Sequence, residues 1–238
     1  MKSLLQLFAL LFITLPVIAQ KNPPVIQLKL YGNLEQAEFN YQKTIGQRIV
    51  TTNQNGYSFG HLSPAINISR GKYNQEIEFS RLIIGRTENV QKLNNLDTNV
   101  PIPVSGERKT ALDISMRYEF NYYLKSNSSR FMPQIGIGVK PYFISTKTTP
   151  LTSANIPLSR MIAGNTVSIV PRIVINLNKN VFLDINTPIG ILDSYYIREK
   201  EENPAFTAAE MKSSQFTTKF FQNWLQLRVG IGVNLSHD

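Results

Sequence analysis

His61 and Ser63 stand two residues apart, a spacing that places both side chains on one face of an extended strand. Glu76 and Glu78 repeat this spacing a short distance along the chain. A histidine base, a serine nucleophile and an orienting acid are the parts of a hydrolytic triad, so His61 and Ser63 are the candidate catalytic pair. Such a spacing is common by chance, and an ordinary hydrogen bond accounts for Ser63 equally well. We therefore expect a non-catalytic protein, with hydrolysis by this pair as the alternative.

No metal and no cofactor are predicted. The chain has two histidines, His61 and His237, far apart in sequence, and it has no run of acids with calcium-loop spacing. It has no cysteine, which excludes disulfides, thiolate catalysis, thiolate metal sites and a lipid-modified cysteine.

The elements that carry these residues follow a period of two, and helical periodicity is scarce. The clearest segment is 112–124, where apolar and aromatic residues occupy one face. Similar segments are 26–31, 57–69, 73–86, 131–145, 166–177, 181–191 and 225–235. These eight segments predict an all-β chain of eight strands.

Short and long connections alternate between the predicted strands. Short polar turns lie at 70–72, 125–130 and 178–180, and long polar segments lie near 35–56, 87–109, 146–165 and 194–215. This alternation is typical of outer-membrane barrels. We predict an eight-stranded antiparallel up-and-down transmembrane β-barrel with four long extracellular loops, three short periplasmic turns and periplasmic termini.

Residues 1–19 have the composition of a secretory signal. A basic start at Lys2 precedes an apolar run, and small residues lead to a cleavage site after Ala19. A retained signal anchor is the weaker interpretation, because the run is shorter than the roughly 20 apolar residues that span a bilayer. Residues 20–238 are expected to form one barrel domain.

The strand pattern alone does not say which face points inward, so a soluble lipocalin-like barrel is the structural alternative. Strands long enough to cross a bilayer at a tilt favour the membrane, as do aromatic residues near strand ends. The predicted aromatic girdle consists of Tyr122, Phe131, Phe143, Tyr195, Phe221 and Trp224.

The polar face carries charges of both signs, and we place it in the lumen. The interior of an eight-stranded barrel is just wide enough for side chains, so buried charges must pair. The predicted lumen ion-pair network consists of Lys29, Glu76, Glu78, Asp113, Arg117, Glu119, Lys140, Arg172, Asp184 and Arg228. A solvated outer face of mixed charge is the alternative. A lumen filled in this way makes a poor channel, so a narrow pore is a secondary hypothesis.

The chain resembles the outer-membrane β-barrel domain proteins of diderm bacteria, which include small OmpA-like and PorT-like barrels. The resemblance rests on the signal ending Ile18-Ala19-Gln20, on 117–124 and 133–138, and on the closing segment 225–235. The family commonly ends in an aromatic residue, whereas this chain ends Ser236-His237-Asp238. The spacing of His61 and Ser63 also looks like that of outer-membrane lipid A deacylases.

The resemblance implies a multi-pass protein of the bacterial outer membrane. The expected partners are outer-membrane lipids, including lipopolysaccharide, and other envelope proteins. The formal net charge of +9 is compatible with nucleic acid, but an exported protein meets anionic lipid head groups first, so no nucleic acid is expected. We expect a membrane anchor, an interaction surface or an accessory subunit of an envelope complex. The alternatives are a lipid A-modifying enzyme and a narrow pore.

Overall fold

The computed structural model describes residues 24–45, 48–94, 101–124, 130–151, 156–221 and 226–235, and it describes side chains outside 35–60 and 89–105. The signal predicted at 1–19 lies outside these residues. The strands are β1 (Val25–Ile45), β2 (Arg48–Arg70), β3 (Tyr73–Asn94), β4 (Pro101–Tyr123), β5 (Phe131–Pro150), β6 (Leu158–Asn176), β7 (Val181–Asn186), β8 (Ile189–Glu201), β9 (Lys212–Phe220) and β10 (Gln226–Asn234). Among the described residues, no helix is long and apolar enough to cross a membrane.

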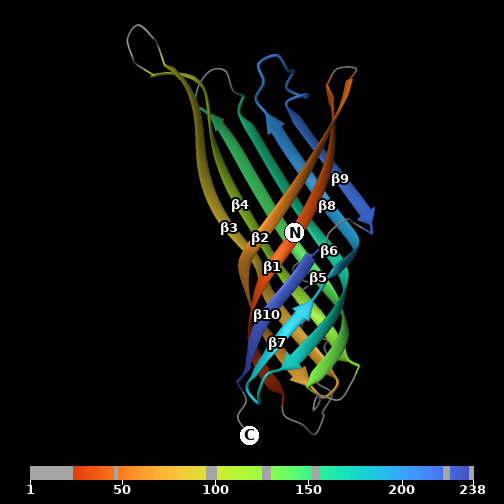
Figure 1. The fold of residues 1–238 in the computed structure, drawn as a ribbon. Helices are drawn as coiled ribbons and strands as arrows, with labels where there is room; N and C mark the ends of the chain where they lie inside the picture. The colour runs from red at the N-terminus through yellow and green to blue at the C-terminus, as the bar shows by residue number, and fades with distance from the viewer. Residues whose placement is uncertain are drawn as a thin grey trace.

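The strands form a closed antiparallel barrel (Figure 1). Each of β1 to β5 pairs with its successor, β6 pairs with β7, β7 with β10, and β10 returns to β1. Both β7 and β8 pair with β6, so they are two parts of the seventh strand, interrupted at Pro188, which has no backbone N–H to donate. Likewise, β9 and β10 form the eighth strand. The prediction of an eight-stranded antiparallel barrel is confirmed.

Alternation decides which side chains face inward. On β10, Gln226 and Arg228 are buried while Leu227 and Val229 are exposed, and the other strands of the closed part repeat this pattern. The exposed apolar side chains form a band around the barrel, which includes Leu28, Leu30, Ile66, Ile68, Ile77, Phe79, Ile114, Phe120, Ile135, Ile137, Ile169, Ile173, Ile189, Val229 and Ile231. An apolar exterior around a polar interior is the arrangement of a membrane barrel.

Short connections join the strands at one end of the barrel, called here the turn rim. At the β2–β3 turn, Arg70 pairs with Tyr73, and Gly71 has a φ of 56°, a conformation that costs a residue with a Cβ about 1–2 kcal/mol. The first residues of β1 and the last of β10 lie at this same rim, because Gln27 pairs with Asn234.

At the other end the expected boundaries of the long loops were wrong. Most of 35–56, 87–109, 146–165 and 194–215 is strand, since β1–β2, β3–β4, β5–β6 and β8–β9 continue as paired hairpins above the barrel (Figure 1). The parts of a hairpin that project beyond the barrel can be polar on both faces, so their composition resembles that of a loop. Its backbone groups are nevertheless satisfied by the ladder, which is why the strands persist.

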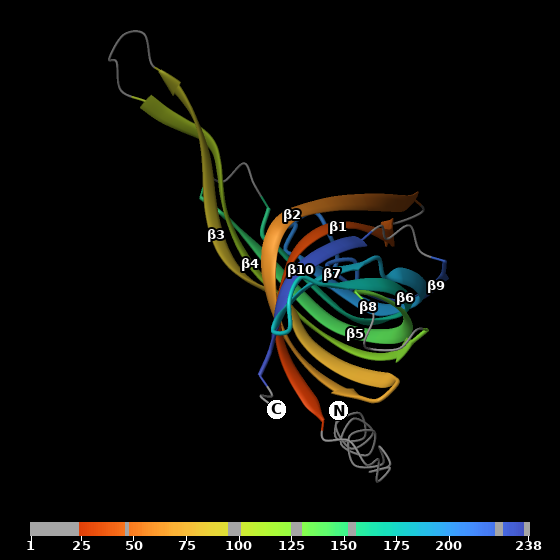
Figure 2. The same cartoon turned by 60° about the horizontal axis from the view of Figure 1, so that its bottom comes forward.

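The barrel wall divides in its upper half. The ladder between β2 and β3 ends at the pair Ala65–Glu78, and above it β2 continues with β1 while β3 continues with β4. The β1–β2 and β3–β4 hairpins then diverge (Figure 2). We call this division the β2–β3 seam.

Candidate functional site

The centre of the lumen contains a buried network of ion pairs, built from residues on the inward face of six strands. Lys29 Nζ lies 2.6 Å from Glu76 Oε2 and 2.7 Å from Asp184 Oδ2. Arg172 Nη1 contacts the same two oxygens at 2.7 and 3.0 Å. Two carboxylates from opposite walls of the barrel are therefore bridged by two cations.

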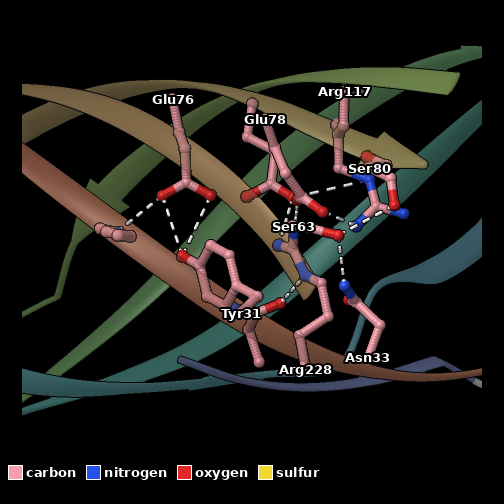
Figure 3. A network of polar contacts seen from close by, with 12 residues as sticks. Tyr31, Asn33, Ser63, Glu76, Glu78, Ser80, Arg117 and Arg228 are labelled. Atoms are coloured by element: carbon pink, nitrogen blue, oxygen red, sulfur yellow. Dashed lines mark hydrogen bonds and ion pairs between the residues drawn. The ribbon is translucent and has the colours of Figure 1, made fainter. Parts of the chain in front are cut away.

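The second part of the network is centred on Arg228 (Figure 3). Its guanidinium donates to Glu78 and Glu119, and Arg172 also donates to Glu119. Arg117 lies 3.7 Å from Glu78 and 3.8 Å from Glu119. All these side chains are at most 3 % exposed, so each charge depends on its partners in place of water.

Tyr31 belongs to the network although it carries no charge. Its hydroxyl lies 3.0 Å from Glu76 Oε2 and 2.9 Å from Asp184 Oδ2, and it donates to these acids. The Arg228 guanidinium lies 4.8 Å from the centre of its ring, within the range of a cation–π contact. We did not predict this role, but its signal is visible in the sequence, because Tyr31 shares the period-two face of Lys29.

The structure brings eight of the ten predicted network residues together, namely Lys29, Glu76, Glu78, Arg117, Glu119, Arg172, Asp184 and Arg228. Asp113 instead pairs with Arg81 at 2.8 Å, in a separate, partly exposed site next to the β2–β3 seam. Lys140 is buried on the lumen face of β5, opposite Thr166 of β6. Arg81 was not anticipated, because an irregularity between Glu78 and Arg81 shifts it onto the inward face.

Apolar and aromatic side chains fill the lumen on both sides of the network. Toward the turn rim, Tyr123, Met132, Val174 and Phe182 form a buried cluster. Toward the hairpins, a second cluster contains Tyr142, Ile162, Tyr195 and Ile197. Beside it, the Tyr142 hydroxyl donates to Asp193 at 3.1 Å, and Thr166 Oγ1 donates to Asp193 at 2.8 Å. Side chains are therefore buried inside the barrel at three successive levels.

Ser63 forms hydrogen bonds between neighbouring strands. It is fully buried, its hydroxyl donates to the Ser80 carbonyl at 2.9 Å, and it accepts a hydrogen bond from Asn33 Nδ2 at 2.6 Å (Figure 3). These contacts connect β1, β2 and β3 just above the last ladder pair. His61 is partly buried on the same face of β2, and its carbonyl lies 3.5 Å from Asn33 Nδ2.

The two acids that a triad would need are engaged elsewhere. Glu76 is bound by Lys29 and Arg172, and Glu78 by Arg228. Both carboxylates are therefore paired with cations of the lumen network. In this geometry the hydrogen bonds of Ser63 connect the strands at the base of the β2–β3 seam.

Oxygen atoms of Glu76, Glu78 and Glu119 all lie within 4.8 Å of one another, which is a spacing compatible with a bound cation. Carboxylates are suitable ligands for Ca²⁺ or Mg²⁺. Here, however, the guanidinium groups of Arg172 and Arg228 already occupy the space around these oxygens. The positive charge that a metal would supply is provided by the protein itself.

The aromatic girdle was predicted partly in the wrong place. Tyr122, Phe131 and Phe143 lie on the outer face, and Phe221 is 77 % exposed at the end of β9.

Tyr195 is fully buried in the upper lumen cluster, so its assignment to the girdle was wrong. An irregularity opposite Val167 and Ser168 shifts the alternation of β8, which moves odd-numbered residues inward after Leu192. Trp224 lies outside the described residues.

Exposed ion pairs lie on the hairpins, away from the lumen. Arg86 and Arg108 each approach Glu88 to 2.6 Å, and their hydrogen bonds lower the pKa of this carboxyl from its ordinary value. Lys200 likewise donates to Glu202 and lowers its pKa. Such pairs in water contribute little to stability.

The closed barrel, its apolar exterior and its paired, filled interior together define a small β-barrel of the outer-membrane type. Among solved structures, OprG of Pseudomonas aeruginosa is 11 % identical over 90 % of this chain and 97 % of its own, with a TM-score of 0.50. A major outer membrane protein of Thermus thermophilus is 10 % identical over 90 % of this chain and its entire length, with a TM-score of 0.44. Outer Membrane Protein W of E. coli is 10 % identical over 91 % of this chain and its entire length, with a TM-score of 0.40. At this identity the similarity to OprG establishes the fold alone.

No protein-family model and no curated protein matches the sequence. The resemblance to OmpA-like or PorT-like barrels therefore rests on the sequence segments named above and stays an expectation.

Proposed function

We propose that the protein is a non-catalytic barrel of the bacterial outer membrane, with the turn rim and both termini in the periplasm, and that it anchors an envelope complex through its projecting hairpins. The observation that carries this proposal is the combination of a lumen closed by side chains with paired strands that extend beyond the apolar band. A wall around a filled interior leaves the outer surfaces and the hairpins for function.

The filled lumen supports an anchor over a channel. An ion that crossed the barrel would have to pass the cluster of Tyr123 and Phe182 and also to displace Arg172 or Arg228 from their carboxylates. The second step breaks contacts that replace water around buried charges. A lumen occupied in this way is the property expected of a structural barrel.

The β2–β3 seam offers a surface for a protein partner. Along β3, Leu82 is 69 % exposed and Ile84 79 % exposed, and Ile83 between them is also exposed. This edge of β3 no longer pairs with β2 above Glu78. A strand edge with accessible apolar side chains on both faces suits the addition of an extended segment from another chain. An envelope protein that contributes such a segment would use β3 as its template.

Ion conductance tests the closed lumen. We expect the purified protein, inserted in planar bilayers at neutral pH, to give no steady conductance above that of the lipid. The physical reason is the occupation of the lumen at three levels. Heat-modifiable migration on detergent gels would show that the inserted protein is folded. Stable, voltage-independent channels from the folded protein would contradict the proposal and favour the pore.

Photo-crosslinking in native membranes tests the partner surface. With a photoreactive amino acid in place of Leu82, we expect one stoichiometric protein adduct, because a partner strand would lie against this edge. The matched control replaces Ile137, which is exposed in the apolar band but lies on β5, whose ladders with β4 and β6 continue on both sides. Ile137 is expected to give lipid adducts alone. The same outcome at Leu82 and Ile137 would argue against a partner at the seam.

A further inference from the structure

The described turns of the turn rim carry four positive charges. Arg70 and Lys72 flank the β2–β3 turn, Arg130 precedes β5, and Lys179 lies between β6 and β7. All four side chains are exposed. The described residues of these connections, 70–73, 124, 130–131 and 177–181, include no aspartate or glutamate. Four cations are therefore distributed around one end of the barrel without acidic neighbours in the described part of the turns.

Many cations elsewhere in the described chain are paired with acids. In the lumen, Lys29, Arg117, Arg172 and Arg228 face Glu76, Glu78, Glu119 and Asp184. At the hairpin end, acids lie beside Arg86, Arg108, Lys109, Arg160 and Lys200. The described turns differ from these regions, because their four cations have no aspartate or glutamate on the same turns.

The position of these cations relative to the apolar band indicates what they meet. The outward apolar residues next to them are Tyr73, Leu124, Phe131 and Leu177, which are 41 to 58 % exposed. The guanidinium of Arg130 lies 6.0 Å from the ring of Phe131, and Tyr73 stacks on Phe120 with ring centres 5.5 Å apart. Tyrosine and other aromatic side chains prefer the membrane interface, where lipid head groups begin. In an inserted barrel, the four cations lie at the level of the lipid phosphates.

We propose that the turn rim, through Arg70, Lys72, Arg130 and Lys179, binds the phosphate groups of anionic glycerophospholipids in the leaflet that it faces. Polybasic surfaces beside a membrane attract anionic head groups, and the aromatic side chains place the cations at the correct depth. This inference rests on the proposed location in a membrane. The four cations of the turn rim would then select anionic lipids over neutral ones.

Lipid retention in nanodiscs tests the proposal. The mature protein is reconstituted in an equimolar mixture of phosphatidylcholine and phosphatidylglycerol, and native mass spectrometry measures the lipids retained after partial delipidation. The rim variant combines Arg70→Gln, Lys72→Gln, Arg130→Gln and Lys179→Gln. The matched control removes the same number of charges from exposed positions at the hairpin end, by Arg86→Gln, Lys109→Gln, Arg198→Gln and Lys212→Gln. A second rim variant with only the changes at Arg130 and Lys179 guards against misfolding at the β2–β3 turn.

The natural protein and the control are expected to retain phosphatidylglycerol preferentially, and the rim variant is expected to lose about tenfold or more of this preference. Salt at about 1 M should weaken the preference of the natural protein, because it screens exposed charges. Equal preference in both rim variants and the control would overturn the proposal. Equal loss in the control and the rim variants would also overturn it, since net charge rather than the rim would then decide. If none of the proteins entered nanodiscs, the proposed membrane location itself would fail.

Discussion

Replacing Arg172 by methionine is expected to lower the free energy of unfolding by about 3–5 kcal/mol, the usual cost of removing one partner from a buried ion-pair network. The guanidinium contacts Glu76, Glu119 and Asp184, all of them buried, and methionine fills a similar volume without charge. Glu119 would keep Arg228, and Lys29 would have to serve both Glu76 and Asp184. The measurement is urea unfolding in detergent, followed by the loss of heat-modifiable migration on gels.

Arg86→Met is the matched control, because Arg86 pairs with Glu88 in water on a projecting hairpin. Its expected effect is between about 0 and 1 kcal/mol. Arg172→Lys should be intermediate, since it keeps the charge but loses the planar fork that reaches several carboxylates. It also provides a folded variant if Arg172→Met does not fold. Equal stability of Arg172→Met and Arg86→Met would show that the lumen network does not depend on Arg172 for its stability.

Gly230→Ala is expected to lower the free energy of unfolding by about 1–3 kcal/mol, as overpacking does in a well-packed interior. A Cβ at Gly230 would lie 2.4 Å from Cδ1 of the Tyr31 ring. Tyr31 has little freedom to move away, because its hydroxyl is bonded to Glu76 and Asp184 and Arg228 lies over its ring. The displacement would therefore be transmitted to the ion pairs. Detergent-gel unfolding gives the stability, and the near-ultraviolet circular dichroism of the aromatic side chains reports the disturbed packing.

Gly32→Ala is the control for this substitution. Gly32 lies next to Tyr31 on the same strand, and the nearest atom to its added Cβ is the Val229 carbonyl oxygen at an ordinary 3.8 Å. The two variants share the loss of a glycine and differ in the face on which the methyl group lies. A Gly230→Ala protein as stable as Gly32→Ala would mean that the Tyr31 ring can shift at no cost.

These substitutions also bear on function. If the lumen network closes the barrel, the loss of Arg172 should increase ion leakage, while the contacts proposed for the β2–β3 seam and the turn rim should be unaffected. Measurements of lipid preference at the turn rim and of crosslinking at Leu82 therefore test features that are independent of the stability of the lumen network. The proposals assign different physical tasks to three regions of the barrel: closure to the lumen, partner binding to the edge of β3, and lipid binding to the turn rim.

The sequence by itself determined the period-two pattern, and with it the fold. Because successive side chains of a strand point to opposite faces, the inward position of Lys29, Glu119 and Arg228 could be read from alternation alone. The charge balance of the polar face further predicted that these residues would have to pair. Glycine at 71 was readable as a turn for the same local reason, since it is free of the Cβ penalty at positive φ.

Only the tertiary structure decided which charges meet, where strands end and where alternation breaks. Lys29 and Asp184 are far apart in the chain and are joined by the register of closed ladders. The irregularities near Arg81 and Leu192 reversed faces locally, which brought Arg81 to Asp113 and buried Tyr195. The long hairpins were mistaken for loops because polarity reports contact with water, whereas strand formation above the apolar band depends on pairing with a neighbour. Pairing is a property of two segments together, and the composition of one segment does not contain it.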